Sequence, residues 1–265
     1  MKVLSFNLWS DAPRNKSWQR RRDAVARVFQ QNEPDLCGLQ EATLPMIRDL
    51  KERLPQFGWI GHGREDGGEL GEHTPIFYRS DRFTLREGGS FWLAPVCDRP
   101  GRGWDAFCCR IVTWARLVES ANGREVVHFN THFDHLGRRA RVQSAWMLLR
   151  KIEEIAGAMP AIVTGDLNCR ESSAPYRVLT GQLPFTDGAP GENALRDTLY
   201  DTEQAPEGPR KTFRGLLGLF GLGRIDYVFV NRGLRTRRHA VLDEAIGASD
   251  HRPVLAELCF AASNK

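Results

Sequence analysis

The sequence predicts an α/β fold in which two sheets pack together and helices cover them. The first half reads as strand, helix, strand and then a run of short hairpins, and the second half repeats this order of element types. No clean internal repeat or low-complexity linker interrupts the 265 residues, a length that suits one large domain. We therefore expect a single domain at 1–265, with the polar ends of its strands along one edge.

The first half alternates between strand and helix patterns. Ser17 can cap the first helix, whose apolar face carries Val25 and Phe29, whereas the three arginines at 20–22 are expected to face solvent. Residues 61–72 form a polar, glycine-rich loop that is either flexible or functional. The expected elements are strands at 3–8, 35–41, 59–60, 75–78, 83–85 and 91–93, and helices at 17–31 and 44–54.

The second half contains the clearest hairpin, because Asn122-Gly123 supplies its turn. Residues 184–209 are rich in Pro, Gly and acidic side chains, and they are expected to form a long surface excursion. The expected elements are strands at 110–119, 125–132, 161–164, 225–230, 236–242 and 254–260, and a helix at 138–156.

The composition is that of an ordinary globular protein, with 41% hydrophobic and 26% charged residues. No apolar run approaches the ~20 residues of a membrane span, and the start of the chain lacks the apolar core of a signal peptide. We expect a cytoplasmic protein, secreted only if a leader has been removed. A net charge of +4 permits an anionic substrate without marking a nucleic-acid binder. The six cysteines include no Cys-x-x-Cys pair, which disfavours zinc and favours free, mostly buried thiols.

The stretch at 161–168 is an apolar run that ends in a carboxylate and a carboxamide, Asp166 and Asn168. Residues two apart in an extended segment point the same way, so both side chains can face one hard cation or one water molecule. Taken alone, the pattern is more typical of an Asx-rich turn. Other strands end in the same way, however, and the further polar residues at their ends are Asn7, Glu41, Asn130, His132, Asp226, Asp250 and His251.

These residues adjoin strands that are otherwise built to be buried, where unpaired charges are costly, so chance is the poorer explanation. Carboxylates and carboxamides without thiolates suit Mg²⁺ or Mn²⁺. Such a site suits phosphate-ester hydrolysis, in which positioning and charge stabilisation supply most of the rate.

Six motifs, taken in chain order, resemble those of a known enzyme superfamily. The chain resembles the endonuclease/exonuclease/phosphatase superfamily, with the deoxyribonuclease and abasic endonuclease type of fold, and is most similar to compact bacterial members related to the deadenylase branch. This implies a four-layer α/β sandwich of two packed, mainly antiparallel sheets flanked by helices. The motifs that carry it, in chain order, are Phe6-Asn7, Leu39-Gln40-Glu41, the segment 130–135, Gly165-Asp166-Leu167-Asn168, Arg224-Ile225-Asp226-Tyr227 and the segment 249–254.

The resemblance implies that Glu41 holds the principal Mg²⁺, or Mn²⁺ in its place. Asn7 would lie beside Glu41 at the metal. Asp250 would be a further ligand of the metal or of a metal-bound water.

The resemblance also implies catalytic roles for residues of the second half. Asp166 would orient or deprotonate the attacking water, and Asn168 would hold the phosphate or that water. His251 would donate to a non-bridging phosphate oxygen, with Asp226 fixing its tautomer. His132 would be a second phosphate donor, and it argues against the abasic endonucleases, which typically carry Tyr there.

Substrate contacts are expected from the loops, with Arg64, Glu72, Trp104 and Arg110 as candidates. Trp104 either stacks on a base or packs beneath its loop. The apolar run at 216–222 is either an exposed lid or a segment folded onto the core. The arginines at 138, 139 and 141, and those at 235, 237 and 238, either track a nucleic-acid backbone or are ordinary surface; Arg238 is expected on the opposite face of its strand from Arg235.

Three functions remain open. The first is a nuclease or nucleotide phosphodiesterase acting on DNA or RNA, which the sequence favours slightly. The second is a hydrolase of small phosphate esters, or of phospholipid or inositol-phosphate head groups. The third is a non-catalytic binding module, disfavoured because no expected metal or catalytic position is substituted. The expected partner is a phosphate-ester substrate, bound by a monomer.

Overall fold

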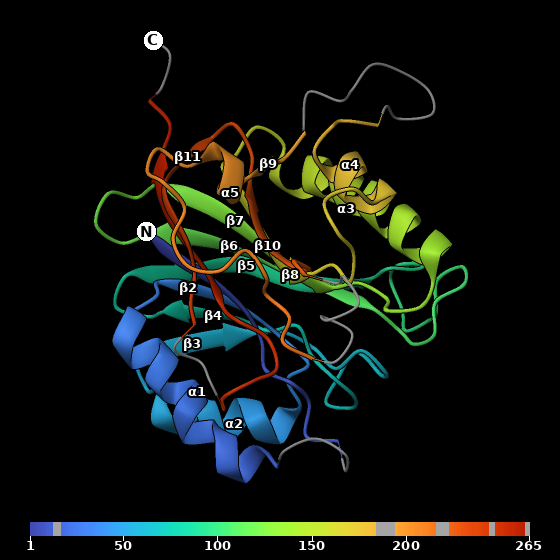
Figure 1. The fold of residues 1–265 in the computed structure, drawn as a ribbon, viewed down its shortest axis with the longest axis horizontal. Helices are drawn as coiled ribbons and strands as arrows, with labels where there is room; N and C mark the ends of the chain where they lie inside the picture. The colour runs from blue at the N-terminus through green and yellow to red at the C-terminus, as the bar shows by residue number, and fades with distance from the viewer. Residues whose placement is uncertain (13–16, 184–193, 216–222, 244–246, 263–265) are drawn as a thin grey trace.

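Two six-stranded sheets pack face to face, and helices cover their outer faces (Figure 1). The structure is a computed structural model that describes residues 1–12, 17–183, 194–215, 223–243 and 247–262. Among the strands described, only β1–β2 and β7–β8 are parallel pairs. The predicted four-layer α/β sandwich of mainly antiparallel sheets is therefore confirmed.

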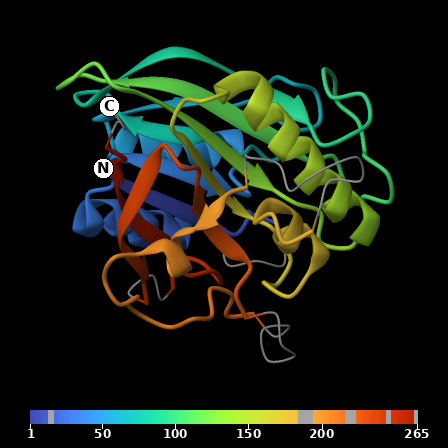
Figure 2. The same ribbon diagram turned by 90° about the horizontal axis from the view of Figure 1, so that it is seen from above.

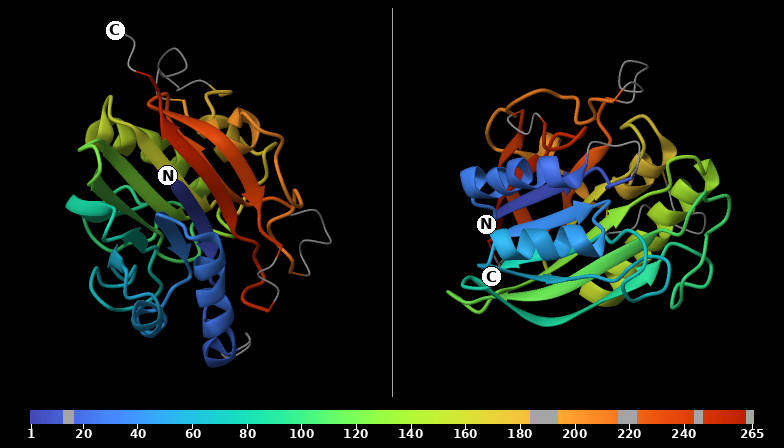
Figure 3. Two further views of the ribbon diagram at one scale, coloured as in Figure 1. Left: turned by 90° about the vertical axis from the view of Figure 1, so that its left-hand side faces the viewer. Right: turned by 90° about the horizontal axis from the view of Figure 1, so that it is seen from below.

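The first sheet has the strand order β11-β12-β1-β2-β4-β3. Helices α1 (Trp18–Asn32) and α2 (Leu44–Arg53) cover its outer face, where Val25 and Phe29 of α1 pack on Phe6 and Leu39 (Figure 3). The strands are β1 (Lys2–Asn7), β2 (Leu36–Gln40), β3 (Phe57–Ile60), β4 (Ile76–Arg79), β11 (Leu234–Val241) and β12 (Val254–Phe260).

The second sheet has the order β5-β6-β7-β8-β10-β9. Helices α3 (Arg138–Ala156) and α4 (Ala174–Leu179) cover its outer face, with α3 lying across the strands in Figure 2. The short helix α5 (Thr198–Asp201) follows β9 directly. The strands are β5 (Phe83–Trp92), β6 (Ile111–Glu119), β7 (Glu125–His132), β8 (Ala161–Asp166), β9 (Arg196–Asp197) and β10 (Asp226–Val230).

A buried polar seam crosses the otherwise apolar interface between the sheets. Asn130 Oδ1 accepts hydrogen bonds from Gln40 Nε2 at 2.7 Å and from Thr164 Oγ1 at 3.0 Å. Asn130 Nδ2 donates to the backbone oxygens of Leu39 and Pro75. A Cβ on residue 38 would lie 1.9 Å from Thr164 Oγ1, so a glycine there lets the sheets approach. Because Glu41 follows Gln40 and His132 lies two residues after Asn130, the seam fixes these two site residues relative to each other.

Each sheet contains one central strand–helix–strand unit, β1-α1-β2 or β7-α3-β8. In the parallel register Asn7 pairs with Gln40, and His132 pairs with Asp166. The carboxyl ends of both parallel pairs therefore carry polar side chains, as the sequence predicted.

Three local expectations in the first half are wrong. Ser17 occupies the N-cap position of α1 without a side-chain hydrogen bond, and Asp11 accepts the Trp18 N–H instead. Arg21 does not face solvent: it is 1% exposed and donates to the backbone oxygens of Leu8, Trp9 and Ala248. The strands expected at 83–85 and 91–93 are one strand, β5, because its glycines allow close packing; a Cβ on residue 88 would lie 2.5 Å from Ile60 Cδ1.

Three further expectations differ from the structure, two in the second half and one about the cysteines of the whole chain. The excursion expected at 184–209 returns to the core at Asp197, which is buried against Arg224 and the Tyr176 hydroxyl. A bulge between Thr236 and Arg238 turns Arg238 to the same face as Arg235, where it pairs with glutamates. Two of the six free cysteines are buried and the other four only half-buried. The run at 216–222 lies outside the described residues, and none of the described helices could span a membrane.

Candidate active site

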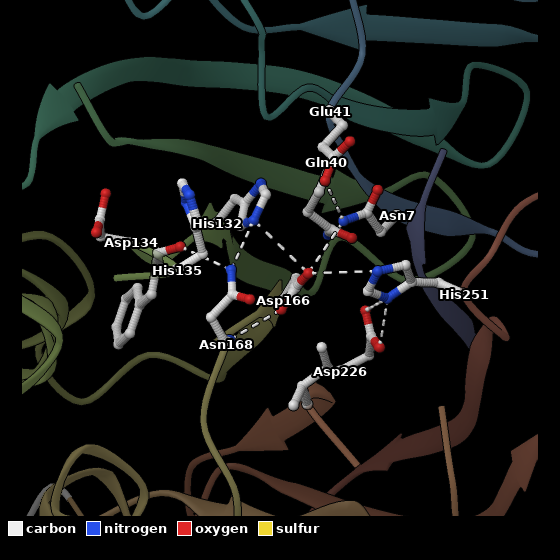
Figure 4. A network of polar contacts seen from close by, with 12 residues as sticks. Asn7, Gln40, Glu41, His132, Asp134, His135, Asp166, Asn168, Asp226 and His251 are labelled. Carbon is white, nitrogen blue, oxygen red and sulfur yellow. Dashed lines mark hydrogen bonds and ion pairs between the residues drawn. The ribbon is translucent and has the colours of Figure 1, made fainter. Parts of the chain in front are cut away.

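Asp166 lies at the centre of a cluster of polar side chains drawn from both sheets (Figure 4). It is the last residue of β8, is 2% exposed, and pairs across the sheet with Asp226 of β10. Its Oδ2 accepts a hydrogen bond from Asn7 Nδ2 at 3.0 Å, and it lies 3.6 Å from His132 Nε2 and 3.8 Å from His251 Nε2. One carboxylate thus joins residues that are far apart in the sequence.

The first sheet contributes Asn7, at the end of β1, and Glu41, directly after β2. Glu41 has a φ of 57°, a left-handed conformation that turns the chain where the strand ends. Its carboxylate accepts hydrogen bonds from Asn7 Nδ2 at 3.1 Å and from the Ser10 N–H at 2.8 Å. Asn7 Oδ1 accepts the Trp9 N–H at 2.9 Å, which only an oxygen can do. The amide nitrogen of Asn7 therefore faces the carboxylates of Glu41 and Asp166.

His251 is held between carboxylates. Its Nδ1 lies 2.9 Å from Asp226 Oδ2, and its backbone N–H donates to Ser249 Oγ, which in turn donates to the backbone oxygen at the end of β1. Burial alone would lower the pKa of His251, but Asp226, with Asp166 and Asp250, raises that pKa to about 10. The imidazole therefore carries a proton on both nitrogens at neutral pH.

His132 is neutral, in contrast to His251. Burial, reinforced by the guanidinium groups of Arg110 and Arg64, holds the pKa of His132 well below its usual range. Asn168 Nδ2 lies 2.9 Å from His132 Nε2 and 3.0 Å from the Phe133 backbone oxygen. Because only the NH₂ group can donate to a carbonyl, His132 Nε2 is the acceptor. The Nδ1–H of His132 is then its remaining donor, and Asn168 Oδ1 remains available to a ligand.

The cluster forms one side of a cavity of about 460 Å³, a size typical of small-molecule sites. Besides the residues above, the walls come from the loops at 61–73 and 103–110 and from the segment after residue 132. The lining residues are Trp9, Ser10, Ala12, Glu41, Arg64, Glu72, Phe107, Cys108, Arg110, His132, His135, Asp166, Asn168, Phe213, Ile225, Asp250 and His251.

Arg110 brings a buried positive charge to this wall. It is 5% exposed, and its Nε and Nη1 atoms have no hydrogen-bond partner among the described residues. The nearest carboxylate, Asp134, lies 3.6 Å away and already accepts four backbone N–H groups. Nη2 of Arg110 lies 3.1 Å from His135 Nδ1. Since a buried charge is costly until it is paired, this guanidinium is prepared for an anion.

Three neighbouring carboxylates have perturbed acidities. Burial, with the nearby charge of Asp226, raises the pKa of Asp166 to about 7. Burial, together with the charge of Glu41, also raises the pKa of Asp250. Burial would likewise raise the pKa of Glu41, but the Ser10 N–H, His251 and Asn7 reduce it below its ordinary value. The site therefore holds two different carboxyl groups: Glu41, which is ionised, and Asp166, which titrates near neutral pH.

The donor set fits a hard divalent cation near Glu41 and Asp250. Both are carboxylates that line the cavity, and the mutual repulsion that raises the pKa of Asp250 would be relieved by a cation. The ligand atoms of Asp166, Asp226 and His251 also lie within 4.8 Å of one another. There, however, His251 Nδ1 is already hydrogen-bonded to Asp226, which suits a protonated imidazole better than a metal ligand.

Of the predicted substrate residues, three line the cavity and one does not. Arg64, Glu72 and Arg110 are in its walls, and Arg64 Nη1 pairs with Glu72 Oε2 at 2.5 Å. Trp104 lies outside the lining and packs at the edge of the core formed by α3 and the second sheet. The arginines at 138, 139, 141, 235, 237 and 238 do not line the cavity either.

Sequence reasoning missed four residues that shape the site. Arg21 holds the segments around Leu8 and Ala248, and Ser249 links His251 to β1. Neither residue was given a role from the sequence, although Ser249 lies in the motif at 249–254, because their partners are mainly backbone groups. Phe107 and Phe213 line the cavity, and each packs its ring on a histidine. They could have been found only as aromatic residues near predicted motifs.

Residues 4–251 match the Endonuclease/Exonuclease/phosphatase family, and the chain belongs to this family. Phosphoester hydrolysis is the class of reaction that defines the family, whose members generally use a divalent metal. The predicted resemblance is confirmed.

Two solved bacterial structures are similar over almost the whole chain. An endonuclease/exonuclease/phosphatase from Bacteroides vulgatus is 35% identical, with a TM-score of 0.89 and 98% of both chains covered. A mannosyl-6-phosphatase from Bacteroides thetaiotaomicron is 33% identical, with a TM-score of 0.87, 98% of this chain and 100% of that chain covered. Protein angel from Drosophila melanogaster is 23% identical over 83% of this chain, which spans only 61% of the length of that relative.

Proposed function

We propose that the protein is a divalent-metal-dependent hydrolase of small phosphate monoesters, built as one domain at 1–265. The observation that carries this proposal is the convergence on Asp166. Residues from the ends of β1, β7 and β8 and from the loop before β12 meet at one carboxylate whose pKa is raised to about 7 by burial and by Asp226. A base with a pKa near the working pH is well matched to deprotonating water.

The metal site is assigned to Glu41 and Asp250, and we propose Mg²⁺, with Mn²⁺ as a substitute. A divalent ion there would stabilise the negative charge that grows on the phosphate. The expectation that Asn7 is a metal ligand stays a prediction. Its hydrogen bonds favour a positioning role instead, because its oxygen is occupied by the Trp9 N–H and its nitrogen joins Glu41 to Asp166.

In the proposed reaction a water attacks phosphorus in line with the leaving group, the P–O bond to that group breaks, and the departing alkoxide takes a proton from solvent to become the alcohol. Asp166 takes the proton from the water. Asn168 orients the water through Oδ1, because both hydrogens of its amide are already donated to His132 Nε2 and the Phe133 oxygen. Of the two roles expected for Asn168, holding the water is therefore the one that its hydrogen bonds support.

The negative charge on the phosphate would be met by two cationic donors, His251 and Arg110. His251 Nε2–H lies 3.8 Å from Asp166 and 4.0 Å from Asp250, beyond hydrogen-bond distance, so it is available to a phosphate oxygen. Asp226 accepts the proton on Nδ1 and holds the ring. Arg110 offers the same anion the N–H groups of Nε and Nη1, two atoms without a partner among the described residues. The role of phosphate donor expected for His132 would require its Nδ1–H.

A small monoester fits the cavity better than a nucleic acid. The loop that carries the Arg64–Glu72 ion pair bounds the cavity. The arginines at 138, 139, 141, 235, 237 and 238, which are the candidates for contact with a nucleic-acid backbone, do not line the cavity. Arg238 is moreover paired with Glu207 and Glu257. The similar mannosyl-6-phosphatase supports a phosphorylated sugar. The slight preference of the sequence for a nuclease stays a prediction, as do a monomeric state and a cytoplasmic location.

A metal-dependent screen tests the proposal. Hexose phosphates, a nucleoside monophosphate, glycerol phosphate, inositol phosphates, a phosphodiester, single-stranded DNA and RNA are incubated with the protein in Mg²⁺, in Mn²⁺ and in EDTA. We expect phosphate release from at least one small monoester that stops in EDTA and in the Glu41→Gln variant. Glu33→Gln, on the αL residue after α1 and away from the cavity, is the matched control.

Two results would overturn the proposal. Cleavage of DNA, RNA or the diester with no turnover of any monoester would assign the site to a nuclease. Binding of these ligands with no turnover under any metal condition would support a binding module.

A further inference from the structure

A single buried carboxylate holds two loops together at the mouth of the cavity. Asp134 is 1% exposed, and its Oδ2 accepts the N–H groups of Phe107 at 3.0 Å and Cys108 at 3.3 Å. Its Oδ1 accepts those of Leu136 at 3.0 Å and Gly137 at 2.7 Å. Burial would raise the pKa of Asp134, but the N–H groups of Gly137, Phe107 and Leu136, with the nearby Arg110, lower it to about 2. The link is therefore ionised and intact at neutral pH.

A second carboxylate fixes the same loop to α3. Asp105 Oδ1 accepts the Ala140 N–H at 2.6 Å, and its Oδ2 accepts the Arg139 N–H at 3.2 Å. Asp105 thus caps the helix from outside, in a place where the N-cap residue Gly137 has no side chain. The loop at 103–110 is held at two points and is a rigid wall of the cavity.

Two large apolar side chains are exposed where Asp134 joins this wall to the start of α3. Phe107 and Leu136 are each 61% exposed, although both are fixed through their backbones by Asp134. The Phe107 ring lines the cavity and meets the His135 imidazole edge to face, with centroids 5.3 Å apart. A large exposed apolar side chain on a rigid loop beside a polar cavity is typical of a binding surface.

The loop at 61–73 of the same cavity is rigid as well. The sequence left it either flexible or functional, and the structure shows paired backbone groups, with Arg64 N–H donating to Glu72 O at 3.0 Å and Gly63 N–H to Gly68 O at 2.8 Å. Trp92 Nε1 anchors the loop by donating to the Arg64 oxygen at 2.7 Å. The Arg64 and Glu72 side chains are therefore held as a fixed pair of hydrogen-bonding groups in the cavity wall.

We propose that Phe107 is a stacking platform for the ring of the alcohol that the substrate phosphate esterifies, and that this alcohol is a polyhydroxylated ring. The inference rests on the proposed function. The apolar C–H face of a sugar ring would lie on the phenyl group, and its hydroxyl edge would bond to Arg64 and Glu72. An acyl chain has no hydroxyl group to bond to Arg64 and Glu72. The aromatic contact that the sequence suggested for Trp104 is thereby assigned to Phe107.

The experiment compares Phe107→Ala and Phe107→Tyr with the wild type on three substrates: a hexose 6-phosphate, a nucleoside 5′-monophosphate and glycerol phosphate, which has no ring. Val96→Ala is the control, since Val96 is also exposed and apolar but lies outside the cavity lining.

We expect Phe107→Ala to raise KM for the hexose phosphate about 10-fold, the scale of one stacking contact. Its kcat should change less than about 2-fold, because the phenyl ring does not touch the reacting atoms. Phe107→Tyr and Val96→Ala should retain the wild-type KM, and glycerol phosphate should be insensitive to all three changes.

If Phe107→Ala changed KM equally for the ring-bearing and ring-free substrates, or changed it for none of them, Phe107 would not be a stacking platform. A rise in KM confined to the nucleotide would overturn the sugar assignment and identify the ring as a base. Equilibrium binding of hexose phosphate and of inorganic phosphate, measured by calorimetry on the same variants, separates this inference from the proposed function. If the wild type hydrolyses no monoester but Phe107→Ala still weakens only the binding of hexose phosphate, the platform stands and the proposed function fails.

Discussion

The two strand–helix–strand units, β1-α1-β2 and β7-α3-β8, have the same topology but contribute different chemistry. In both, parallel strands end in polar side chains, and the chain then turns through a left-handed residue, Glu41 in the first and Asn168 in the second. The first unit supplies a carboxylate whose pKa stays low despite burial, because N–H donors and His251 surround it. The second supplies Asp166, whose pKa burial and Asp226 raise to about 7.

The difference shows that neighbours, more than residue type, determine the role of each carboxylate. Glu41 accepts N–H groups and is suited to hold a cation, whereas Asp166 faces a second carboxylate across the sheet and is suited to exchange a proton. Variants of the first unit should therefore lose activity that added metal ion partly restores. Variants of the second unit should lose activity to the same extent at every metal concentration.

The largest effect is expected in the second unit. Asp166→Asn removes the proposed base but keeps a side chain that can accept the Asn7 hydrogen bond, so kcat should fall by roughly 10³-fold. The loss should be the same at all Mg²⁺ concentrations in steady-state assays, with the thermal midpoint nearly unchanged. If added Mg²⁺ restored the activity of Asp166→Asn, Asp166 would act in metal binding, like Glu41, and not as the base.

The next effect concerns the seam that joins the units. Asn130→Leu removes the buried hydrogen bonds of Asn130 to the Leu39 and Pro75 oxygens and to the Gln40 amide, which should reduce the free energy of unfolding by about 3 kcal/mol. Urea denaturation measures this loss. Gln31→Leu, at an exposed position of α1, is the matched amide-to-leucine control. A loss below about 1 kcal/mol would mean that apolar contacts alone fix the two sheets.

The third effect concerns the group that the two units share. His251→Gln keeps a donor but loses the positive charge, and kcat should fall by roughly 10²-fold, the scale of losing one transition-state donor. KM for a monoester should change much less. Asp226→Asn should act in the same direction, since Asp226 holds the ring through Nδ1. Wild-type kcat in both variants would remove His251 from the proposed reaction.

The smallest effect is a pH dependence of stability in the second sheet. Burial lowers the pKa of His128 to about 3, below its ordinary 6.5, so the folded protein keeps this imidazole neutral. Below pH 6.5 the unfolded chain takes up a proton that the folded chain does not, and stability falls as the pH falls towards 3. His128 contributes at most about 1.4 kcal/mol per pH unit to the slope of the unfolding free energy against pH. His128→Gln should make the slope shallower in urea titrations between pH 4 and 6.5 and leave it unchanged above pH 7.

The sequence predicted the layered fold, and the polar residues that it singled out at the strand ends lie together around Asp166 in the structure. It did not predict which aromatic residue faces the cavity, since Phe107 is placed by Asp134, which joins two loops that are distant in sequence. Arg21 was assigned to solvent because its partners are backbone oxygens. The strand β5 was divided because its glycines look like a turn until the neighbouring strand is known.

The most direct test of the central proposal is Mn²⁺ binding, followed by electron paramagnetic resonance, in the wild type and in Glu41→Gln, with His251→Gln as the control. If the first unit holds the cation, the wild type binds Mn²⁺, Glu41→Gln weakens that binding by at least roughly 10-fold, and His251→Gln does not weaken it. Equal Mn²⁺ affinity in the wild type and in Glu41→Gln would contradict the division of labour between the two units.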